Sequence, residues 1–317
     1  MRALVTGGAG FIGSTLVDRL LAEGHAVDVV DDLSSGSLAN LADARSNPDS
    51  DFTFHRLDIR SPEVVELIAR RQPEVVFHLA AQMDVRVSVA KPVFDAEVNI
   101  IGSLNVLEGA RQGGTRKVVF ASSGGTIYGD PDPVELPLRE THPQQPLSPY
   151  GVSKKAVGDY LVAYRLLHDL EFTALALANI YGPRQNPHGE AGVVAIFSGR
   201  LIDGEQCTIF GDGSMTRDYT FVDDVVDAFA RAADGGDGLL LNIGTGKETS
   251  VRELYDTVAH YTGSTVEPLY APERPGELKR SCLDPGRAAI HLGWKPWTTI
   301  EAGIGQTVDW FRAQRAT

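Results

Sequence analysis

The sequence predicts an α/β fold built on a doubly wound parallel sheet. Short apolar runs alternate with longer amphipathic stretches through roughly the first half of the chain, and the apolar runs are rich in valine, leucine and phenylalanine. Strands that are apolar on both faces are typical of a sheet covered on both sides by helices. Regular alternation of strand and helix implies right-handed crossovers, and hence parallel strands.

The expected elements follow from these patterns. Strands are expected over residues 3–6, 26–30, 52–55, 75–79, 117–121 and 173–178. Helices are expected over residues 11–23, 62–71, 94–112 and 150–167. After about residue 180, proline, glycine and charged residues become frequent and the strands become short. We therefore expect a main domain over residues 1–180, to which segments near 220–246 return, and a smaller lobe over residues 181–317.

Composition limits the possible functions. The chain has 317 residues, a net charge of −13 and two cysteines, Cys207 and Cys282. An acidic chain is a poor candidate for binding nucleic acid or an anionic membrane. No apolar stretch reaches the ~18 residues of a membrane span, and the histidines lack metal-ligand spacing. Two distant thiols are typical of a reducing compartment. The sequence therefore predicts a cytoplasmic enzyme without a metal.

A glycine-rich turn lies between the first strand and the first helix. The stretch TGGAGFIG places either Gly7 or Gly8 in register with Gly10 and Gly13. In such a turn the backbone can approach a pyrophosphate, whose charge the helix N-terminus favours. The turn alone predicts a dinucleotide site only weakly.

Acidic residues follow the second and third strands. Asp31 lies about 20 residues beyond the turn, where a carboxylate can accept both hydroxyls of an adenosine ribose and would repel a 2′-phosphate. This position favours NAD over NADP. Asp32 fits an exposed acidic loop as well as it fits a cofactor contact. Asp58 could reach the adenine edge, although its spacing alone indicates only a loop acid.

Tyr150 and Lys154 form the pattern that carries chemistry. Residues four apart on a helix lie on the same face. A tyrosine normally titrates near 10, so it is a poor base at neutral pH. A nearby ammonium and a cationic nicotinamide would both favour the phenolate. The pair therefore predicts a tyrosine base with a lysine that lowers its pKa.

Several further motifs follow in order: DDL, LDIR, VFHLAAQ, NIIGSLNVLEGA, SSGGTIYG, PYGVSK, NIYGPRQ and RDYTFVDDV. Together with the glycine turn they resemble the extended short-chain dehydrogenase/reductase family, nearly end to end from Arg2 to about Phe311. Within it the chain is most similar to the UDP-glucose (UDP-galactose) 4-epimerases. The resemblance implies a Rossmann-type sheet of seven strands and a C-terminal lobe that binds a nucleotide sugar. It also implies that Gly7, Gly10 and Gly13 form the phosphate-binding turn, and that the match of Gly8 to the G-x-G-x-x-G pattern is a coincidence.

The resemblance also implies which residues line the cofactor cleft. The implied NAD-binding set comprises the glycine turn, the acidic loop, the ends of the next strands and the catalytic helix: Gly7, Gly10, Phe11, Ile12, Gly13, Asp31, Asp32, Leu33, Ser35, Gly36, Asp58, Ile59, Leu79, Ala80, Ala81, Gln82, Asn99, Ser122, Tyr150 and Lys154. In this set Asn99 supports the catalytic helix.

The family's reactions differ after a shared first step, the transfer of a hydride from sugar C4 to NAD. Related dehydratases carry an Asp-Glu pair after the strand-end serines, and related decarboxylases carry a Glu. This chain has Gly124, Gly125 and Thr126 there, so water elimination lacks its general acid. Many epimerases have a serine at the position of Gly124. The hydroxyl that orients O4 must then come from Thr126 or Ser123, with Ser122 a third choice.

These features favour a 4-epimerase. A dehydratase or decarboxylase of the same family is the first alternative, and an NAD-binding sensor without activity is the second.

The nucleotide sugar is expected to meet Ser123, Thr126 and Tyr150 together with residues of the second half. By resemblance Asn179 meets the phosphates or the sugar, Arg217 and Arg274 hold the diphosphate, and Glu277 holds the uridine ribose. Ser281 aligns with the family's gate for the sugar C2 substituent, and a small residue there would admit UDP-GlcNAc and UDP-GalNAc. Relatives dimerise through the helices at 94–112 and 150–167, so a homodimer is expected.

Overall fold

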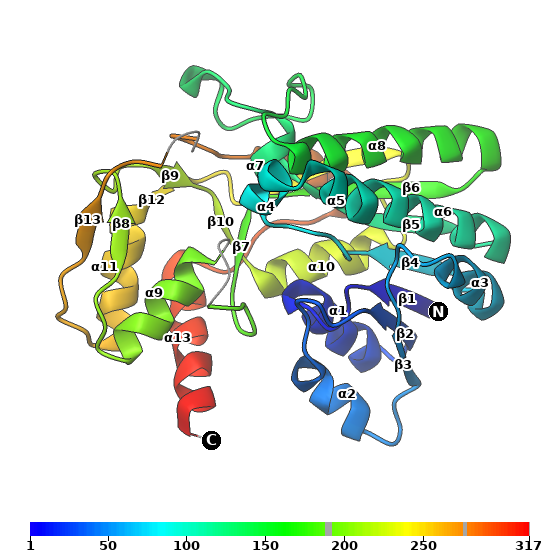
Figure 1. The fold of residues 1–317 in the computed structure, drawn as a ribbon, viewed down its shortest axis with the longest axis horizontal. Helices are drawn as coiled ribbons and strands as arrows, with labels where there is room; N and C mark the ends of the chain where they lie inside the picture. The colour runs from blue at the N-terminus through cyan, green and yellow to red at the C-terminus, as the bar shows by residue number, and fades with distance from the viewer. Residues whose placement is uncertain (188–191, 275–277, 317) are drawn as a thin grey trace.

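The computed structural model describes residues 1–187, 192–274 and 278–316, and within these ranges its central feature is a parallel sheet of seven strands (Figure 1). The strand order is β11-β6-β5-β4-β1-β2-β3. The strands are β1 Arg2–Thr6, β2 Ala26–Asp31, β3 Phe52–Arg56, β4 Val75–His78, β5 Lys117–Ser123, β6 Glu171–Leu177 and β11 Leu239–Ile243. The order reverses between β1 and β4, and ligands of open α/β sheets bind at the carboxyl ends beside such a reversal.

Helices cover both faces of the sheet, and the strands alternate between them. On β1, Ala3 and Val5 pack in one core cluster, while Leu4 packs in the other. The first cluster lies under α1 Phe11–Ala22 and α10 Val222–Ala232; the second lies under α3 Glu63–Arg71, α6 Gly102–Gly113 and α8 Pro149–His168. Because both faces of the sheet are covered by helices, each strand has apolar side chains on both of its faces.

The smaller lobe lies beside the sheet (Figure 1) and is built from three packed helices with short strands around them. The helices are α9 Val193–Ile202, α11 Val251–Thr262 and α13 Ile300–Ala316. The short strands are β7 Asn179–Tyr181, β8 Thr208–Phe210, β9 Thr216–Arg217, β10 Tyr219–Phe221, β12 Thr249–Ser250 and β13 Leu269–Ala271, which pair β7 with β10, β9 with β12 and β8 with β13.

The remaining helices are short. They are α2 Ala42–Ser46, α4 Val85–Ala90, α5 Pro92–Ala96, α7 Gly124–Ile127 and α12 Gly286–Leu292, with 3₁₀ turns at Leu38–Leu41 and Pro133–Glu135. Of the helices in the described ranges, none is long and apolar enough to cross a membrane.

One expected element differs in the structure, and one expected return to the sheet is present. The stretch expected as one helix over 94–112 is helical throughout but is not one regular α-helix: α5 leads into a π-helical turn at Glu97–Ile101, and α6 follows. Helical periodicity alone does not show such a turn, which is common at functional sites. The segment at 222–243 does return to the main sheet, because β11 pairs with β6 and α10 packs on α1.

Candidate active site

The glycine turn after β1 is shaped by close backbone contacts. Gly7 has φ +71, and a Cβ atom added there would lie 2.7 Å from the Ala80 nitrogen. A Cβ atom at Gly13 would lie 2.1 Å from the Gly7 carbonyl oxygen. The α1 N-terminus carries no side-chain cap, so its first N–H groups can meet an anion. Gly8 has a separate packing cause, since a Cβ there would lie 2.7 Å from Val29 Cγ1.

The acidic loop after β2 is tied to this turn through Asp31. Its Oδ2 accepts from the Ala9 nitrogen at 2.9 Å and its Oδ1 from the Leu33 nitrogen at 2.8 Å, and burial raises the pKa of the carboxyl. A carboxylate has about four acceptor sites, so ribose hydroxyls remain possible partners. Asp32 instead accepts from the nitrogen and hydroxyl of Ser34.

Two further loop residues lie near the turn. A Cβ atom at Gly36 would lie 2.9 Å from the Ala9 carbonyl carbon, which places Gly36 against the turn, whereas Ser35 is exposed. This part of the loop therefore approaches the turn through its backbone.

Asp58 and Ile59 follow β3. Arg60 donates to both Asp58 oxygens and lowers the pKa of that carboxyl. Ile59 is buried against Gly102. A surface hollow of about 440 Å³ beside them is lined by Asp58, Arg60, Ser61, Glu97 and Ile101. Any ligand contact of Asp58 must share its carboxylate with Arg60.

The segment after β4 is held by the π-helical turn. The Gln82 nitrogen donates to Asn99 Oδ1 at 2.8 Å, and Asn99 Nδ2 donates to the Gln82 carbonyl at 2.9 Å and to Asp95 Oδ1 at 3.0 Å. Asp95 is fully buried and its Oδ2 accepts from Ser153 on α8 at 2.6 Å. Asp95 was not among the residues predicted from the sequence, although its spacing of four from Asn99 places both on one helix face.

The residues before Gln82 complete the same wall. Leu79 donates its backbone nitrogen to the Thr6 carbonyl at 3.1 Å, and Ala80 donates its nitrogen to Thr6 Oγ1 at 3.2 Å. Ala81 is half-buried. The end of β4 is therefore bound to the end of β1, beside the glycine turn.

Tyr150 and Lys154 lie on the first turns of α8, which begins after the cap residue Ser148. The Tyr150 phenol is hydrogen-bonded to Ser123, and burial raises its pKa to about 12. Lys154 Nζ lies 5.7 Å from the centre of the Tyr150 ring and donates to the Ala121 carbonyl at 2.8 Å. Burial lowers the pKa of Lys154 to about 8. Burial therefore outweighs the lowering of the Tyr150 pKa by Ser123, and the pKa is raised where the sequence predicted that it would be lowered.

The three candidate hydroxyls for orienting O4 have different surroundings in the structure. Ser123 contacts the Tyr150 phenol, Ser122 is buried, and Thr126 Oγ1 makes a long contact of 3.5 Å with the Ser123 carbonyl. A Cβ atom at Gly124 would lie 2.4 Å from Leu283 Cδ1 and 3.2 Å from the Ala176 carbonyl oxygen. Packing of Leu283 therefore leaves no room for a side chain at position 124 without a shift of Leu283.

The residues assigned to the nucleotide sugar lie on segments beside the smaller lobe. Asn179 begins β7 and donates its backbone nitrogen to the Asp218 carbonyl at 2.9 Å. Arg217 ends β9, directly before Asp218. Arg274 lies 3.7 Å from the centre of the Phe210 ring. Glu277 lies outside the described residues. Asn179 is thus hydrogen-bonded to the residue that follows Arg217, and Arg274 lies against Phe210 at the end of β8.

His78 lies in β4 with both ring nitrogens hydrogen-bonded. Nδ1 is 2.7 Å from Thr6 Oγ1 and Nε2 is 2.8 Å from Ser103 Oγ. Burial lowers its pKa to about 3, which keeps the ring neutral. Among the described residues there is no group of three or more metal-ligating side chains.

The fold and the site together define a dinucleotide-binding α/β protein with a tyrosine–lysine pair. A family model described as GDP-mannose 4,6 dehydratase matches residues 4–307. The chain belongs to this family of extended short-chain dehydrogenases/reductases.

Three relatives illustrate the similarity. A UDP-glucose 4-epimerase of Mycolicibacterium smegmatis is 53% identical, covering 98% of this chain and 99% of that protein. The crystal structure of Thermotoga maritima UDP-glucose 4-epimerase with UDP-glucose is 45% identical, with TM-score 0.95 over 99% of this chain and 100% of that one. The Thermus thermophilus UDP-glucose 4-epimerase in complex with NAD is 44% identical, with TM-score 0.90 over 98% and 99%.

Proposed function

We propose that this chain is an NAD-dependent 4-epimerase that interconverts UDP-galactose and UDP-glucose, as enzymes of galactose metabolism do. The observation that carries the proposal is the contact of the Tyr150 phenol with Ser123, beside Lys154, in a chain without a carboxylic acid at residues 124–126. The 53% identity to an epimerase supports the same activity.

NAD fits the residues present. The glycine turn admits a backbone approach that a Cβ atom would block, and Asp31 lies where ribose hydroxyls are bound. When bound, NAD supplies a reversible hydride acceptor. Gly7, Gly10, Gly13 and the start of α1 would hold the pyrophosphate, and Lys154 would hold the nicotinamide ribose.

The proposed steps follow from the side chains. Tyr150 as phenolate takes the proton from the sugar 4-hydroxyl, while Ser123 orients O4. Lys154 stabilises the phenolate; because burial alone raises the Tyr150 pKa, we infer that the positive nicotinamide contributes as well. With bound NAD as the hydride acceptor, the sugar would pass through a 4-keto form, and rotation of this form about its diphosphate link would let the hydride return to the other face of C4. Tyr150 then returns the proton.

The segment at residues 124–126 favours this outcome over elimination. A Cβ atom at Gly125 would meet only Asn179 Oδ1, at 4.0 Å, so this position faces open space near a proposed substrate residue. An acid there could protonate a leaving group, and this chain has none. Without that acid, return of the hydride is the available route.

Incubation with UDP-galactose carrying deuterium at C4 tests the proposal. We expect UDP-glucose of equal mass with the deuterium retained. A product lighter by water or CO₂ would instead support a dehydratase or decarboxylase. Tyr150→Phe should lower kcat by about 10²–10⁴-fold, the usual contribution of a general base. A fully active Tyr150→Phe variant would contradict the mechanism, and bound NAD without turnover of any nucleotide sugar would favour a sensor.

The proposal of a second pair of substrates depends on Ser281, which is 7% exposed. A small side chain at this position leaves room for an N-acetyl group, so UDP-GlcNAc and UDP-GalNAc are proposed as additional substrates. Parallel assays on both pairs test this, and the absence of UDP-GlcNAc conversion would remove the idea.

We further propose a division of labour between the two parts of the chain, with residues 1–180 and the returning segments binding NAD and the lobe at 181–317 binding the UDP-sugar. Arg217, Arg274 and Glu277 are proposed for the UDP moiety, Asn179 for the sugar or phosphates. The acidic charge and the two buried thiols support a cytoplasmic location.

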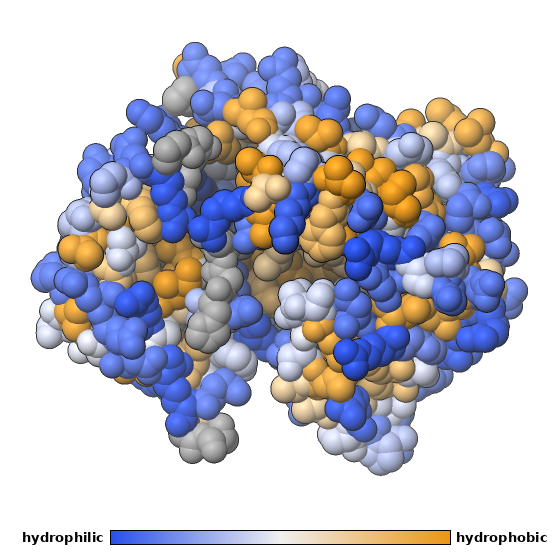
Figure 2. Space-filling model, viewed as in Figure 1, coloured by the Kyte–Doolittle hydropathy of each residue, from blue (hydrophilic) through white to orange (hydrophobic). Residues whose placement is uncertain are grey.

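A homodimer is proposed through the helices around α8. Val89, Val93, Ile101, Val152 and Val162 are 46–71% exposed, and hydrophobic residues gather over this part of the surface (Figure 2). Such a patch on one face favours an isologous contact. Light scattering should give twice the 34.1 kDa mass of the chain; a monomer at micromolar concentration would contradict the dimer.

A further inference from the structure

Three chain segments meet beside the proposed UDP-sugar site. The first is β9, which ends in Arg217, and the second is β12, which pairs antiparallel with β9 and places Thr249 opposite Arg217. The third is residues 279–281, whose Lys279 carbonyl accepts from the Thr216 nitrogen at 3.0 Å. Two of these segments carry residues assigned to the substrate, Arg217 and Ser281.

Glu248, directly before β12, joins the three segments through its carboxylate. Its Oε1 accepts from the Thr216 hydroxyl and from Arg280 Nε, the latter at 2.9 Å. Its Oε2 accepts from Arg280 Nη2. The side chain is 22% exposed, and these partners lower the pKa of its carboxyl, so it is ionised at neutral pH.

Each contact of Glu248 lies one residue away from a substrate residue. Thr216 precedes Arg217, and Arg217 Nη1 itself donates to the Thr216 carbonyl at 2.8 Å. Arg280 precedes Ser281. Because adjacent Cα atoms are about 3.8 Å apart, a shift at either contact passes to its neighbour. The position of Glu248 therefore affects both substrate residues together.

The opposite side of this region is already rigid. The Asp218 carboxylate is buried and accepts from the nitrogens of Thr245 at 2.8 Å, Gly246 at 3.1 Å and Leu283 at 3.3 Å. The backbone beyond Arg217 and beyond Ser281 is thus fixed from within. Glu248 supplies the corresponding restraint from the solvent side.

We propose that Glu248 is a positioning residue for substrate binding, which holds the diphosphate-binding arginine and the C2 gate in one fixed relation. The inference rests on the proposed function for the identity of the ligand. Glu248 touches neither the reacting atoms nor the cofactor residues described above, so its removal should act on substrate affinity and leave the chemical step nearly intact.

Two variants and one matched control test this. Glu248→Ala removes both contacts, whereas Glu248→Gln keeps an acceptor for Thr216 and loses the charge that holds Arg280. The control is Asp203→Asn, which breaks another long-range carboxylate–arginine pair of the same lobe, that with Arg315 at 2.6 Å. All proteins are prepared with bound NAD, and kinetics with UDP-galactose are combined with calorimetric titration of UDP.

We expect Glu248→Ala to raise KM and weaken UDP binding about tenfold while kcat stays within about threefold, because loss of a hydrogen bond to a charged group changes an equilibrium by about this factor. Glu248→Gln should lie between Glu248→Ala and wild type. Asp203→Asn should leave KM and UDP binding unchanged. Unchanged UDP binding in both Glu248 variants, or an equal loss in the control, would overturn the proposal.

The test separates this proposal from the epimerase assignment. If the wild-type chain binds UDP but converts no UDP-galactose, the proposed reaction fails and calorimetry still measures the effect of Glu248. If Glu248→Ala does not fold, the Gln variant gives the same comparison. A wild-type chain that does not bind UDP would overturn both proposals.

Discussion

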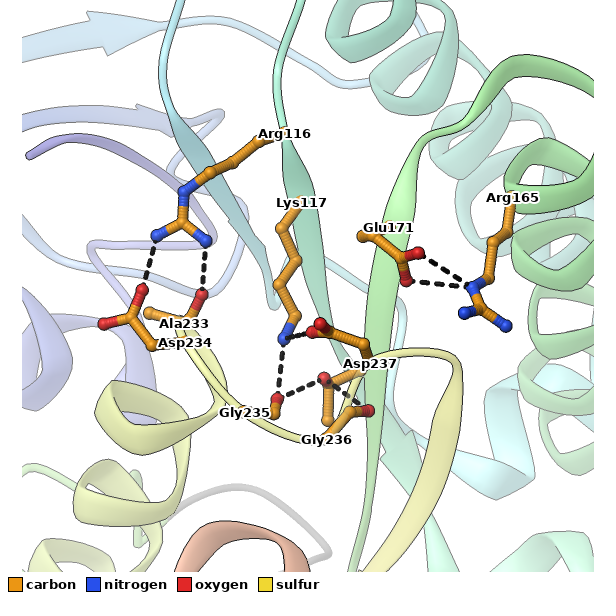
Figure 3. A network of polar contacts seen from close by, with 10 residues as sticks. Arg116, Lys117, Arg165, Glu171, Ala233, Asp234, Gly235, Gly236 and Asp237 are labelled. Carbon is orange, nitrogen blue, oxygen red and sulfur yellow. Dashed lines mark hydrogen bonds and ion pairs between the residues drawn. The ribbon is translucent and has the colours of Figure 1, made fainter.

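Two buried lysines lie near opposite ends of β5. Lys117 begins the strand and is 1% exposed, while Lys154 on α8 reaches the far end and is 4% exposed. Lys117 Nζ donates to the Gly235 carbonyl at 2.6 Å and pairs with Asp237 at 2.5 Å (Figure 3). Lys154, among the described residues, donates to the Ala121 carbonyl alone. The ammonium of Lys117 is satisfied by its own chain, whereas that of Lys154 keeps donors for a ligand.

The surroundings of Lys117 explain this difference. Figure 3 shows Arg116 donating to the Ala233 carbonyl and pairing with Asp234, close to the contacts of Lys117 with the same loop. These contacts attach the loop between α10 and β11 to the amino ends of β5 and β6. Ligands of parallel sheets bind at the carboxyl ends. Burial of a charge is thus structural at one end of the strand, whereas at the other end we propose that it serves catalysis.

The largest expected difference between the lysines is in turnover. Lys154→Met should lower kcat by about 10²–10⁴-fold, because the phenolate of Tyr150 loses the cation that stabilises it. Lys117→Met should leave kcat within about twofold. Steady-state kinetics on UDP-galactose with NAD-saturated protein measure both. A comparable loss in the two variants would show that the lysines do not differ in role.

The substitution Lys117→Met should lower the free energy of unfolding. Lys117→Met leaves the Gly235 carbonyl without its ammonium donor, and a buried acceptor without a partner costs about 1–3 kcal/mol. We expect the free energy of unfolding to fall by that amount in urea denaturation. Thr173 Oγ1 also donates to the Gly235 carbonyl at 2.9 Å, which favours the lower half of the range. An unchanged midpoint would contradict the structural role.

Lys154→Met should have the opposite effect on stability. Burial lowers the Lys154 pKa to about 8, from 10.5 in an unfolded chain. The native state therefore binds fewer protons than the unfolded state between these pH values, and wild-type stability rises with pH across that window. The cofactor-free variant should be more stable than wild type by about 1–3 kcal/mol at pH 7. The advantage should shrink as the pH rises from 8 towards 10.5.

Urea denaturation at several pH values checks this sign. Lys117→Met serves as the control, because Asp237 opposes the lowering of the Lys117 pKa and its pH dependence should be smaller. A Lys154→Met variant that is less stable at pH 7 would mean that its contacts outweigh the cost of burying the charge.

Much of this arrangement could be predicted from local patterns. The glycine turn, Asp31 and the pair Tyr150–Lys154 depend on spacings along a strand, turn or helix, and the structure places each beside the carboxyl ends of the sheet. The roles assigned to these residues remain predictions. Local periodicity did not indicate the π-helical turn that directs Asn99 towards Asp95 and Gln82.

Other features depend on residues far apart in sequence. The glycine at position 124 follows from Leu283, and the partner of Lys117 is 120 residues away at Asp237. The contact of the Tyr150 phenol with Ser123, on which the proposed role of Ser123 rests, depends on where α8 places the phenol. Such contacts arise only when the sheet is assembled, so one sequence without its fold could not identify them.

The smallest effect concerns the carboxylate partner of Lys117. Asp237 is 57% exposed, and exposed ion pairs contribute about 0–1 kcal/mol. Asp237→Asn should therefore destabilise by less than Lys117→Met, and the difference between it and wild type should diminish at high salt. A double-mutant cycle of the two substitutions measures their coupling. If coupling accounts for nearly all of the Lys117→Met loss, the carboxylate of Asp237 rather than the Gly235 carbonyl makes Lys117 structural.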